Sequence, residues 1–159
     1  MSIEKAKAHL EKFGLAERIQ EFPVSSATVA LAAEALGTEE ARIAKSLSFD
    51  LGDEAILIIA AGNARIDNHK FKEKFKKKAK MLPSPEVEAK IGHAVGGVCP
   101  FGINSGVSVY LDSSLKPYPT VFPACGSSNS AVELTLEELE KASGFKEWVD
   151  VCKLPESNA

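Results

Sequence analysis

A run of seven apolar residues from Ala55 to Ala61 constrains the fold more than any other part of the chain. Because no position in it is polar, the run predicts a central strand that is buried on both faces. Just before it, Leu47, Phe49 and Leu51 alternate with serines and an aspartate, which predicts a strand with one buried face. The turn residues Gly52 and Asp53 separate the two strands. The chain must therefore build a sheet.

Helical patterns lie on both sides of these strands. The predicted helices cover 3–13, a short stretch at 15–19, Val29–Leu36 (capped by Ser25 or Ser26), 38–44, 67–80, 85–91 (capped by Ser84), and a last helix opened by a capping box from Thr135 to Glu138. Further strands are predicted at 107–111, 118–122 and 131–134. This order predicts one α+β domain over residues 1–155, with a mixed or antiparallel sheet flanked by helices and a frayed tail at 156–159.

Composition excludes several classes of protein. The 159 residues are 45% hydrophobic and 26% charged, which is ordinary for a globular protein, and the net charge of −3 gives no general reason to bind nucleic acid. The N-terminus is charged and has no apolar core of a signal peptide, and the longest apolar run is too short to cross a membrane. Three cysteines, none of them in a CxxC pair, predict a reduced, cytoplasmic setting.

The loop from Gly96 to Gly102 is the first candidate site. It has three glycines, one proline and almost no polar side chain. Glycine lets backbone N–H groups approach a ligand closely, so the loop could stabilise an oxyanion or hold a phosphate. A tight structural turn has the same composition, and a loose glycine pattern alone favours that interpretation.

Lys45 is the second candidate. It shares the parity of Leu47, Phe49 and Leu51, so on a strand its side chain would point inward, where a lysine needs a partner or a site. Alternatively, Lys45 ends the preceding helix, where a cation complements the helix dipole. Periodicity leaves the two alternatives open.

A basic segment runs from Arg65 to Lys80. Its eight cations and two acids give a net charge of +6, so the rest of the chain carries −9. Such asymmetry predicts a surface that faces phosphates, although a solvated helix face would have the same composition. Phe71 and Phe75 are expected to pack inward.

Histidines and cysteines give no further motif. His9, His69 and His93 lack the spacing of metal ligands, and His93 is expected to be a surface or loop residue. Cys99 has no activating histidine or aspartate placed by sequence, so a small packed thiol is expected. No P-loop, GxSxG elbow or dinucleotide fingerprint is present. We therefore expect no cofactor and no metal.

Taken in order, these motifs resemble the YbaK/ProX family, free-standing relatives of the editing domain inserted in bacterial prolyl-tRNA synthetase. The resemblance rests on Ala44-Lys45-Ser46-Leu47, on Gly96-x-x-x-Pro100 with Phe101-Gly102, on Leu111-Asp112, and on Gly126-Ser127-Ser128-Asn129 before Val132-Glu133-Leu134. It covers nearly the whole chain, and the Gly-Ser-Ser-Asn sequence is closer to the ProX branch. The resemblance implies a sheet that can close into a partial barrel.

The resemblance also implies trans-editing, which is hydrolysis of the ester that joins a wrong amino acid to tRNA, often tRNA(Pro). It implies a catalytic site at Lys45, Gly96 and Gly97 with no protein nucleophile. The implied substrate-binding residues are Val98, Cys99, Pro100, Phe101, Asp112, Gly126, Ser127, Ser128 and Asn129. The basic segment would guide the acceptor stem through Arg65, Lys70, Lys74, Lys77 and Lys78.

Two rival functions remain open at this point. One is a nucleic-acid-binding module without catalysis, which no helix-turn-helix, zinc-finger or RRM signature supports. The other is an adaptor that docks on a synthetase such as prolyl-tRNA synthetase. For the enzyme, we expect water to attack the ester carbonyl while the loop amides stabilise the oxyanion and Lys45 anchors the terminal adenosine.

Overall fold

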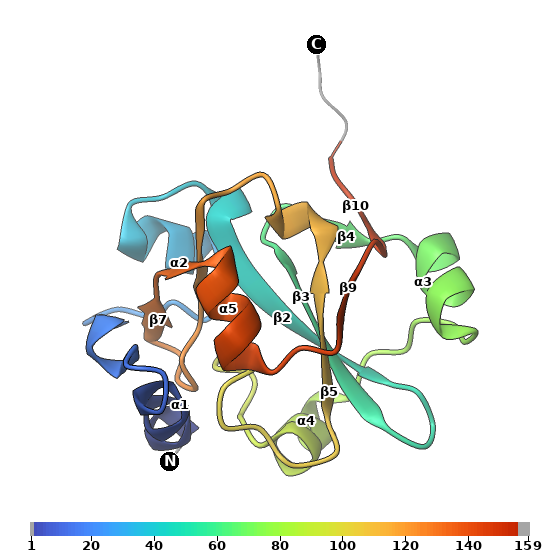
Figure 1. Ribbon diagram of the computed structural model, residues 1–159, viewed down its shortest axis with the longest axis horizontal. Coiled ribbons are helices and arrows are strands. Elements are labelled where there is room, and N and C mark those ends of the chain that lie inside the picture. Colours follow the sequence, from blue (N-terminus) through green and yellow to red (C-terminus); the bar gives the residue numbers. More distant parts are fainter. Residues whose placement is uncertain (1, 156–159) are drawn as a thin grey trace.

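The computed structural model describes residues 2–155, and the frayed tail predicted at 156–159 lies outside the described residues. One six-stranded mixed sheet forms the centre and curls into a half-barrel (Figure 1). Its strand order is β8 (Leu134–Thr135), β6 (Thr120–Pro123), β2 (Ile43–Asp50), β3 (Ala55–Ala61), β5 (Ser108–Asp112) and β9 (Glu147–Val149). The prediction of an α+β fold around a mixed sheet is confirmed.

The strand pairing within this sheet is mixed. The hairpin β2–β3 is antiparallel from Ala44 opposite Ala61 to Asp50 opposite Ala55. The β2–β6, β3–β5 and β5–β9 pairs are parallel, and β6–β8 is antiparallel. Since β6 meets β2 at Ile43 and Ala44 and no further along, the remaining edge of β2 is left for other segments of the chain.

Within residues 2–155, five α-helices surround the sheet. They are α1 (Ser2–Glu11), α2 (Val29–Leu36), α3 (Asn68–Phe75), α4 (Ser84–Ile91) and α5 (Leu136–Ser143). In Figure 1, α1 and α2 lie at one side of the sheet and α3 lies at the other. The capping box predicted at Thr135 and Glu138 is confirmed, whereas α2 is capped by Thr28 instead of Ser25 or Ser26, and Ser84 is the first residue of α4 instead of its cap.

Two small antiparallel pairs complete the strands, and only one of their members, β7, overlaps a predicted strand, that at 131–134. β1 (Ile19–Glu21) pairs with β7 (Ser130–Val132), and β4 (Arg65–Ile66) pairs with β10 (Cys152–Lys153). Short 3-10 helices lie at Ala16–Arg18, Glu40–Arg42 and Ser113–Leu115. Strands of two or three residues are too short to show a period in the sequence.

The core confirms the central strand. Every side chain from Ile56 to Ala61 is 0% exposed. Phe71 and Phe75 of α3 pack inward as expected: the Phe71 ring lies between Phe49 and Phe75, and Phe75 continues to Tyr110. Aromatic contacts therefore anchor α3 to one end of the sheet.

Two helix predictions are wrong at their ends. The helix expected at 38–44 is a 3-10 turn at Glu40–Arg42, because Ile43 and Ala44 are taken into the sheet by pairing with Phe122 and Pro123. Lys45 is therefore a strand residue, and the alternative that placed it at a helix end is wrong. The basic helix stops at Phe75 instead of continuing to Lys80, since Lys76 adopts a left-handed conformation with φ 61°. Among the described residues, no helix is long and apolar enough to cross a membrane.

Candidate functional site

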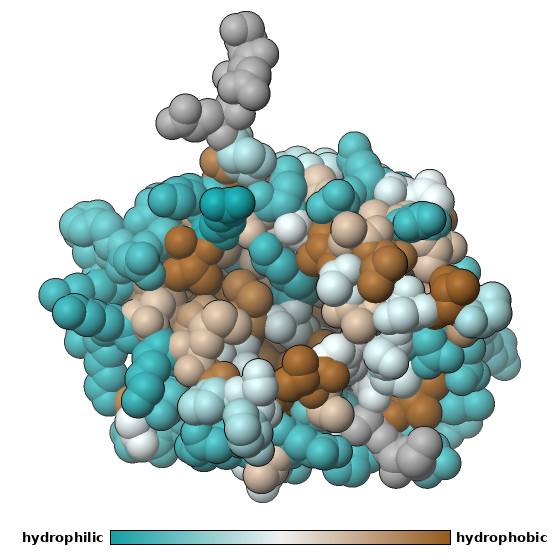
Figure 2. Space-filling model, turned by 180° about the vertical axis from the view of Figure 1, so that it is seen from behind, coloured by the Kyte–Doolittle hydropathy of each residue, from teal (hydrophilic) through white to brown (hydrophobic). Residues whose placement is uncertain are grey.

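A cavity of about 240 Å³ lies beside the open edge of β2. Its volume is below the roughly 300–1,000 Å³ typical of drug-sized ligand sites, so it suits a small group. Figure 2 shows a face of the molecule that is hollowed near its middle, with hydrophobic residues gathered around the hollow. Val95 and Met81 line the cavity and are 61% and 55% exposed, so apolar side chains form part of its rim.

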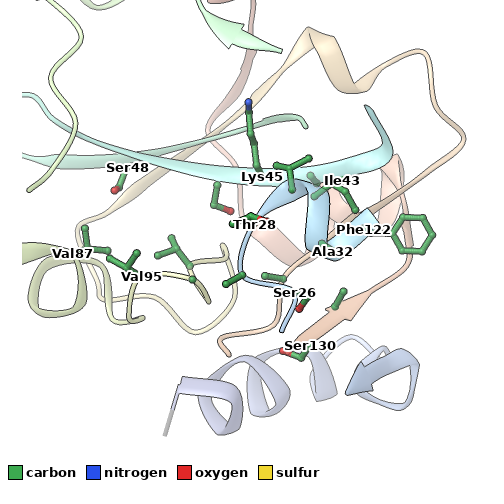
Figure 3. A pocket seen from close by; sticks show the side chains of 18 of the residues that line it. Ser26, Thr28, Ala32, Ile43, Lys45, Ser48, Val87, Val95, Phe122 and Ser130 are labelled. Atoms are coloured by element: carbon green, nitrogen blue, oxygen red, sulfur yellow. The ribbon is translucent and has the colours of Figure 1, made fainter. Parts of the chain in front are cut away.

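Four segments far apart in the sequence form the cavity wall (Figure 3). One is the start of α2 with the residues before it, the second is β2, the third is α4 with the glycine loop, and the fourth is formed by β6 and β7. The polar side chains among the lining residues are Lys45 and the hydroxyl residues Ser26, Thr28, Ser46, Ser48, Ser84 and Ser130. Among the described residues, no carboxylate, imidazole or thiol lines it.

The glycine loop contributes backbone to this wall. Gly96 and Val98 line the cavity, and their N–H groups have no acceptor among the described residues. The Gly97 N–H, in contrast, donates to the Ala94 carbonyl at 3.0 Å and closes a turn. The unpartnered amides at the cavity are therefore those of Gly96 and Val98, while Gly97 shapes the loop.

Gly97 has a steric reason to be glycine. A Cβ there would lie 2.6 Å from both the carbonyl carbon of Gly126 and the nitrogen of Ser127, closer than real contacts allow. Gly96 has φ +97°, which glycine adopts without strain. The two loops that the sequence singled out separately thus lie backbone against backbone.

The second loop supports the site without lining it. The Ser26 N–H donates to the Ser128 carbonyl at 2.6 Å, and the Phe22 N–H donates to the Asn129 carbonyl at 2.7 Å. The Ser127 hydroxyl lies 2.6 Å from that of Ser130. Gly126, Ser127, Ser128 and Asn129 therefore hold the approach to α2, and the cavity is lined by the next two residues, Ser130 and Ala131.

Lys45 lines the cavity, but its ammonium points elsewhere. Figure 3 shows its side chain on the other side of β2 from Ser48, Val87 and Val95. The Nζ atom donates to the Gly62 carbonyl at 3.3 Å and also to the Ala64 carbonyl. Burial lowers the pKa of Lys45. In this conformation Lys45 braces the turn after β3.

Asp112 lies away from the cavity and is 1% exposed. Its Oδ1 accepts the Val151 N–H at 2.9 Å and its Oδ2 accepts the Ser114 N–H at 3.0 Å. The carboxylate therefore caps the 3-10 turn after β5 and fastens the C-terminal segment. An aspartate after a strand can cap a turn in this way, because its short side chain reaches nearby backbone N–H groups.

The far end of the glycine loop is buried. Cys99 and Phe101 are 0% exposed, Pro100 is buried, and none of the three lines the cavity. The expectation of a packed Cys99 thiol agrees with this burial, which raises its pKa to about 12. His93 lies in the loop after α4, as expected, but it is not a surface residue: it is 0% exposed, with Nε2 at 3.5 Å from the Cys99 sulfur.

Three of the eight cations in the basic segment have partners within the chain. Lys70 forms an ion pair with Asp150 at 3.1 Å, and Lys74 pairs with Glu147. Lys77 donates to the Leu51 carbonyl. Among the described residues, Arg65 and Lys78 have no ion-pair partner. Pairing lowers the charge that the helix offers to a phosphate backbone.

Sequence reasoning missed the residues from α2 and the polar face of β2. Ser46 and Ser48 alternate with apolar residues, a pattern that is typical of a solvent-facing side. In the structure that side faces the cavity, because α4 and the approach to α2 cover it. Among the described residues, no group of three or more His, Cys, Asp or Glu side chains could hold a metal ion.

Comparison with known proteins places this geometry in a family. A model described as "Aminoacyl-tRNA editing domain" matches residues 24–142. The chain is 53% identical over 154 residues to "Uncharacterized protein YwhH" of Bacillus subtilis, covering 96% of this chain and 98% of YwhH. It is 30% identical over 110 residues to "Putative Cys-tRNA(Pro)/Cys-tRNA(Cys) deacylase EbsC" of Enterococcus faecalis, covering 67% of this chain and 66% of EbsC.

A solved structure agrees with these relatives. It is described as a "putative trans-editing enzyme for prolyl tRNA synthetase", with a TM-score of 0.85 and 32% sequence identity over 98% of each chain. The half-barrel and its helices are thus an architecture that such proteins share. Because the family model matches most of this chain, from residue 24 to residue 142, the chain belongs to the YbaK/ProX family of aminoacyl-tRNA editing domains.

Proposed function

We propose that the protein is a trans-editing deacylase that hydrolyses the ester of a small amino acid mischarged onto tRNA(Pro), as a member of the ProX branch. The observation that supports this most is the cavity wall at Gly96 and Val98, where two N–H groups lack acceptors among the described residues. Such donors are what an ester carbonyl needs as it becomes an oxyanion.

Water is the nucleophile in this proposal. Its oxygen attacks the carbonyl carbon, the carbonyl oxygen becomes the oxyanion beside the loop amides, and the bond to the ribose oxygen then breaks. The ribose oxygen takes a proton as it leaves, and the amino acid departs as a free acid. Since the cavity has no carboxylate, imidazole or thiol among its described lining residues, we expect a hydroxyl of the substrate's ribose, or the thiol of a cysteinyl substrate, to assist proton transfer.

The size and chemistry of the cavity support a small substrate. Its 240 Å³ must hold the aminoacyl group, and alanines and serines form much of the wall. Bulky side chains are excluded sterically, which gives the second sieve that editing requires when a synthetase cannot discriminate by one methylene. Delivery of such a tRNA by prolyl-tRNA synthetase is part of the proposal.

The test is a deacylation assay with a panel of mischarged tRNAs. Ala-tRNA(Pro) and Cys-tRNA(Pro) are compared with Ser- and Thr-charged tRNAs and with correctly charged Pro-tRNA(Pro). We expect hydrolysis of a small mischarged amino acid and sparing of Pro-tRNA(Pro). Absence of hydrolysis across the whole panel would refute the proposed activity.

A glycine pair provides the matched control. Gly96 and Gly106 have φ of +97° and +91°, so alanine strains the backbone equally at both sites, but Gly106 lies in open space away from the cavity. Gly96→Ala should lower the deacylation rate by about 100-fold, because displacement of one oxyanion donor costs that much. Gly106→Ala should leave the rate of the folded protein unchanged.

A further inference from the structure

His93 is a buried polar residue that the proposed chemistry does not use. It follows α4, and its Nε2 lies 2.6 Å from the carbonyl oxygen of Phe101. A carbonyl oxygen can only accept, so the proton of the neutral imidazole is on Nε2. His93 and Phe101 are the two ends of the segment that contains Gly96 and Val98, and their hydrogen bond closes this segment at its base.

The surroundings of the other ring nitrogen, Nδ1, favour the neutral form of the imidazole. Nδ1 is buried and has no hydrogen-bond partner among the described residues. A proton on Nδ1 would bury an unpaired donor and a positive charge, which is costly. The ionisable groups that face this region are the Cys99 thiol, Lys5 of α1, whose Nζ lies 3.4 Å from the Gly92 carbonyl, and His9 of α1, whose ring lies 5.9 Å from that of Phe101. Lys5 further disfavours an imidazolium.

The loop is held at several points besides this bond. Inside it, the Gly97 N–H bonds to Ala94, and the backbone of Gly97 rests on Gly126. At its base, a Cβ on Gly102 would lie 2.7 Å from the Lys5 carbonyl oxygen, so α1 packs directly on the chain there. Just outside the loop, Asn104 donates its N–H to the Ile91 carbonyl at 2.8 Å and its side-chain amide to the Ala89 carbonyl at 2.9 Å. The imidazole makes the bond that joins residues 93 and 101 themselves.

A catalytic dyad of His93 and Cys99 is the obvious alternative, since the two side chains lie 3.5 Å apart. Both residues are 0% exposed and neither lines the cavity, so no ester can reach the sulfur. The two side chains therefore contact the buried side of the loop and do not contact the substrate.

We propose that neutral His93 is a positioning residue: it closes the 93–101 loop and so holds the Gly96 and Val98 amides at the cavity wall. This inference rests on the proposed function for its effect on rate. Its effect on the loop is independent of that function.

Two substitutions at His93 separate positioning from packing. Glutamine places an amide N–H near the position of Nε2 and can restore the bond to Phe101. Leucine fills the space but leaves that carbonyl with only the weak Cys99 S–H donor, at 3.6 Å. Cys99→Ala is the control, because it alters the same buried cluster and keeps the imidazole bond. Thermal unfolding identifies a temperature at which all variants are folded, and kinetics are measured there with whichever mischarged tRNA the wild-type protein hydrolyses.

We expect His93→Leu to lower kcat by about 100-fold, the size of effect that a misplacement of about 1 Å produces, with KM changed by less than about threefold. His93→Gln should recover most of the lost kcat. If folded His93→Leu keeps the wild-type kcat, or if glutamine and leucine are equally impaired, His93 does not position the loop.

Hydrogen exchange provides a readout that needs no activity. Amide exchange across residues 94–98 should be faster in His93→Leu than in wild-type, His93→Gln or Cys99→Ala protein. Unchanged exchange in the leucine variant would overturn the inference. If the wild-type protein hydrolyses no mischarged tRNA while exchange changes as expected, the proposed function fails and the structural role of His93 stands.

Discussion

The ammonium of Lys45 lies 3.3 Å from the carbonyl oxygen of Gly62, on the side of β2 away from the cavity. Gly62 itself is tightly packed: a Cβ there would lie 2.1 Å from the Glu40 carbonyl oxygen. Lys45 thus joins its own strand to a turn that has no room for a side chain. To reach a substrate in the cavity, its ammonium would have to leave these carbonyl groups.

Lys45→Met tests this relationship, because methionine keeps the apolar stem and removes the ammonium. The family resemblance implies that Lys45 anchors the terminal adenosine, so we expect deacylation to fall by about 100-fold through loss of substrate positioning. The free energy of unfolding should fall by at most about 2 kcal/mol, since the lysine is only partly buried and its bonds are to carbonyl groups. Full deacylation by folded Lys45→Met or Lys45→Ala protein would contradict the proposed mechanism.

Asp112→Asn should destabilise the fold without changing the chemistry. The carboxylate accepts two backbone N–H groups, and an asparagine can accept only one while turning its NH2 group toward the other. We expect a loss of about 1–3 kcal/mol in urea unfolding. Asp53→Asn in the exposed β2–β3 turn is the control and should cost almost nothing. A large fall in kcat for folded Asp112→Asn would show that the residue takes part in the reaction.

The three cysteines should be unreactive in the folded protein. Burial raises the pKa of Cys99 and of Cys152 to about 12 and raises that of Cys125 as well. At pH 8 a thiol with a pKa of 12 is thiolate in only about one molecule in 10,000. Labelling with iodoacetamide, followed by mass spectrometry, should be slow in buffer and rapid in urea. Fast native labelling of Cys99 that also abolishes deacylation would point to a thiol nucleophile.

Lys78 should contribute more to tRNA binding than Lys74. Lys74 is paired with Glu147, whereas Lys78 has no partner among the described residues. Each phosphate contact that is lost reduces the slope of log K against log salt concentration by about one. We expect that reduction for Lys78→Ala and a smaller one for Lys74→Ala, measured by titration of tRNA at several salt concentrations. Equal slopes for both variants and the wild type would exclude this segment from the interface.

Stability should depend on pH through His93. Burial lowers the pKa of His93 in the folded state, so the unfolded chain binds more protons. The stabilising contribution of neutral His93 is therefore fully present above the pKa of an unfolded histidine, about 6.5, and is lost as the pH falls below it. As the pH falls below about 6.5 the wild type should lose stability, and His93→Gln should lose less over the same range. Asp50, Asp67 and Glu138, whose pKa values are lowered mainly by hydrogen bonds, act near pH 4 and below. Identical pH curves for wild type and His93→Gln would contradict this prediction.

Local patterns predicted the elements that are long or clearly bounded. The apolar run 55–61 became β3 and the capping box at Thr135 opened α5. The predicted helix at 38–44 failed because pairing with β6 draws Ile43 and Ala44 into the sheet, and tertiary pairing overrides a weak local preference. The sequence placed His93 in a loop but did not predict its burial, because nothing in its neighbours along the chain shows that α1 and the loop cover it.

The sequence by itself determined that this chain forms an α+β domain with a buried central strand, and the order of its motifs placed it in an editing family. Only the tertiary structure decided which groups meet at the site. It packed Gly97 against Gly126 and turned the serine face of β2 toward the cavity. It also formed the hydrogen bonds of Asp112 with Val151 and of Lys45 with Gly62. The physical reason is that periodicity records which side of one element is apolar, whereas these contacts join groups from different elements and depend on how the elements pack.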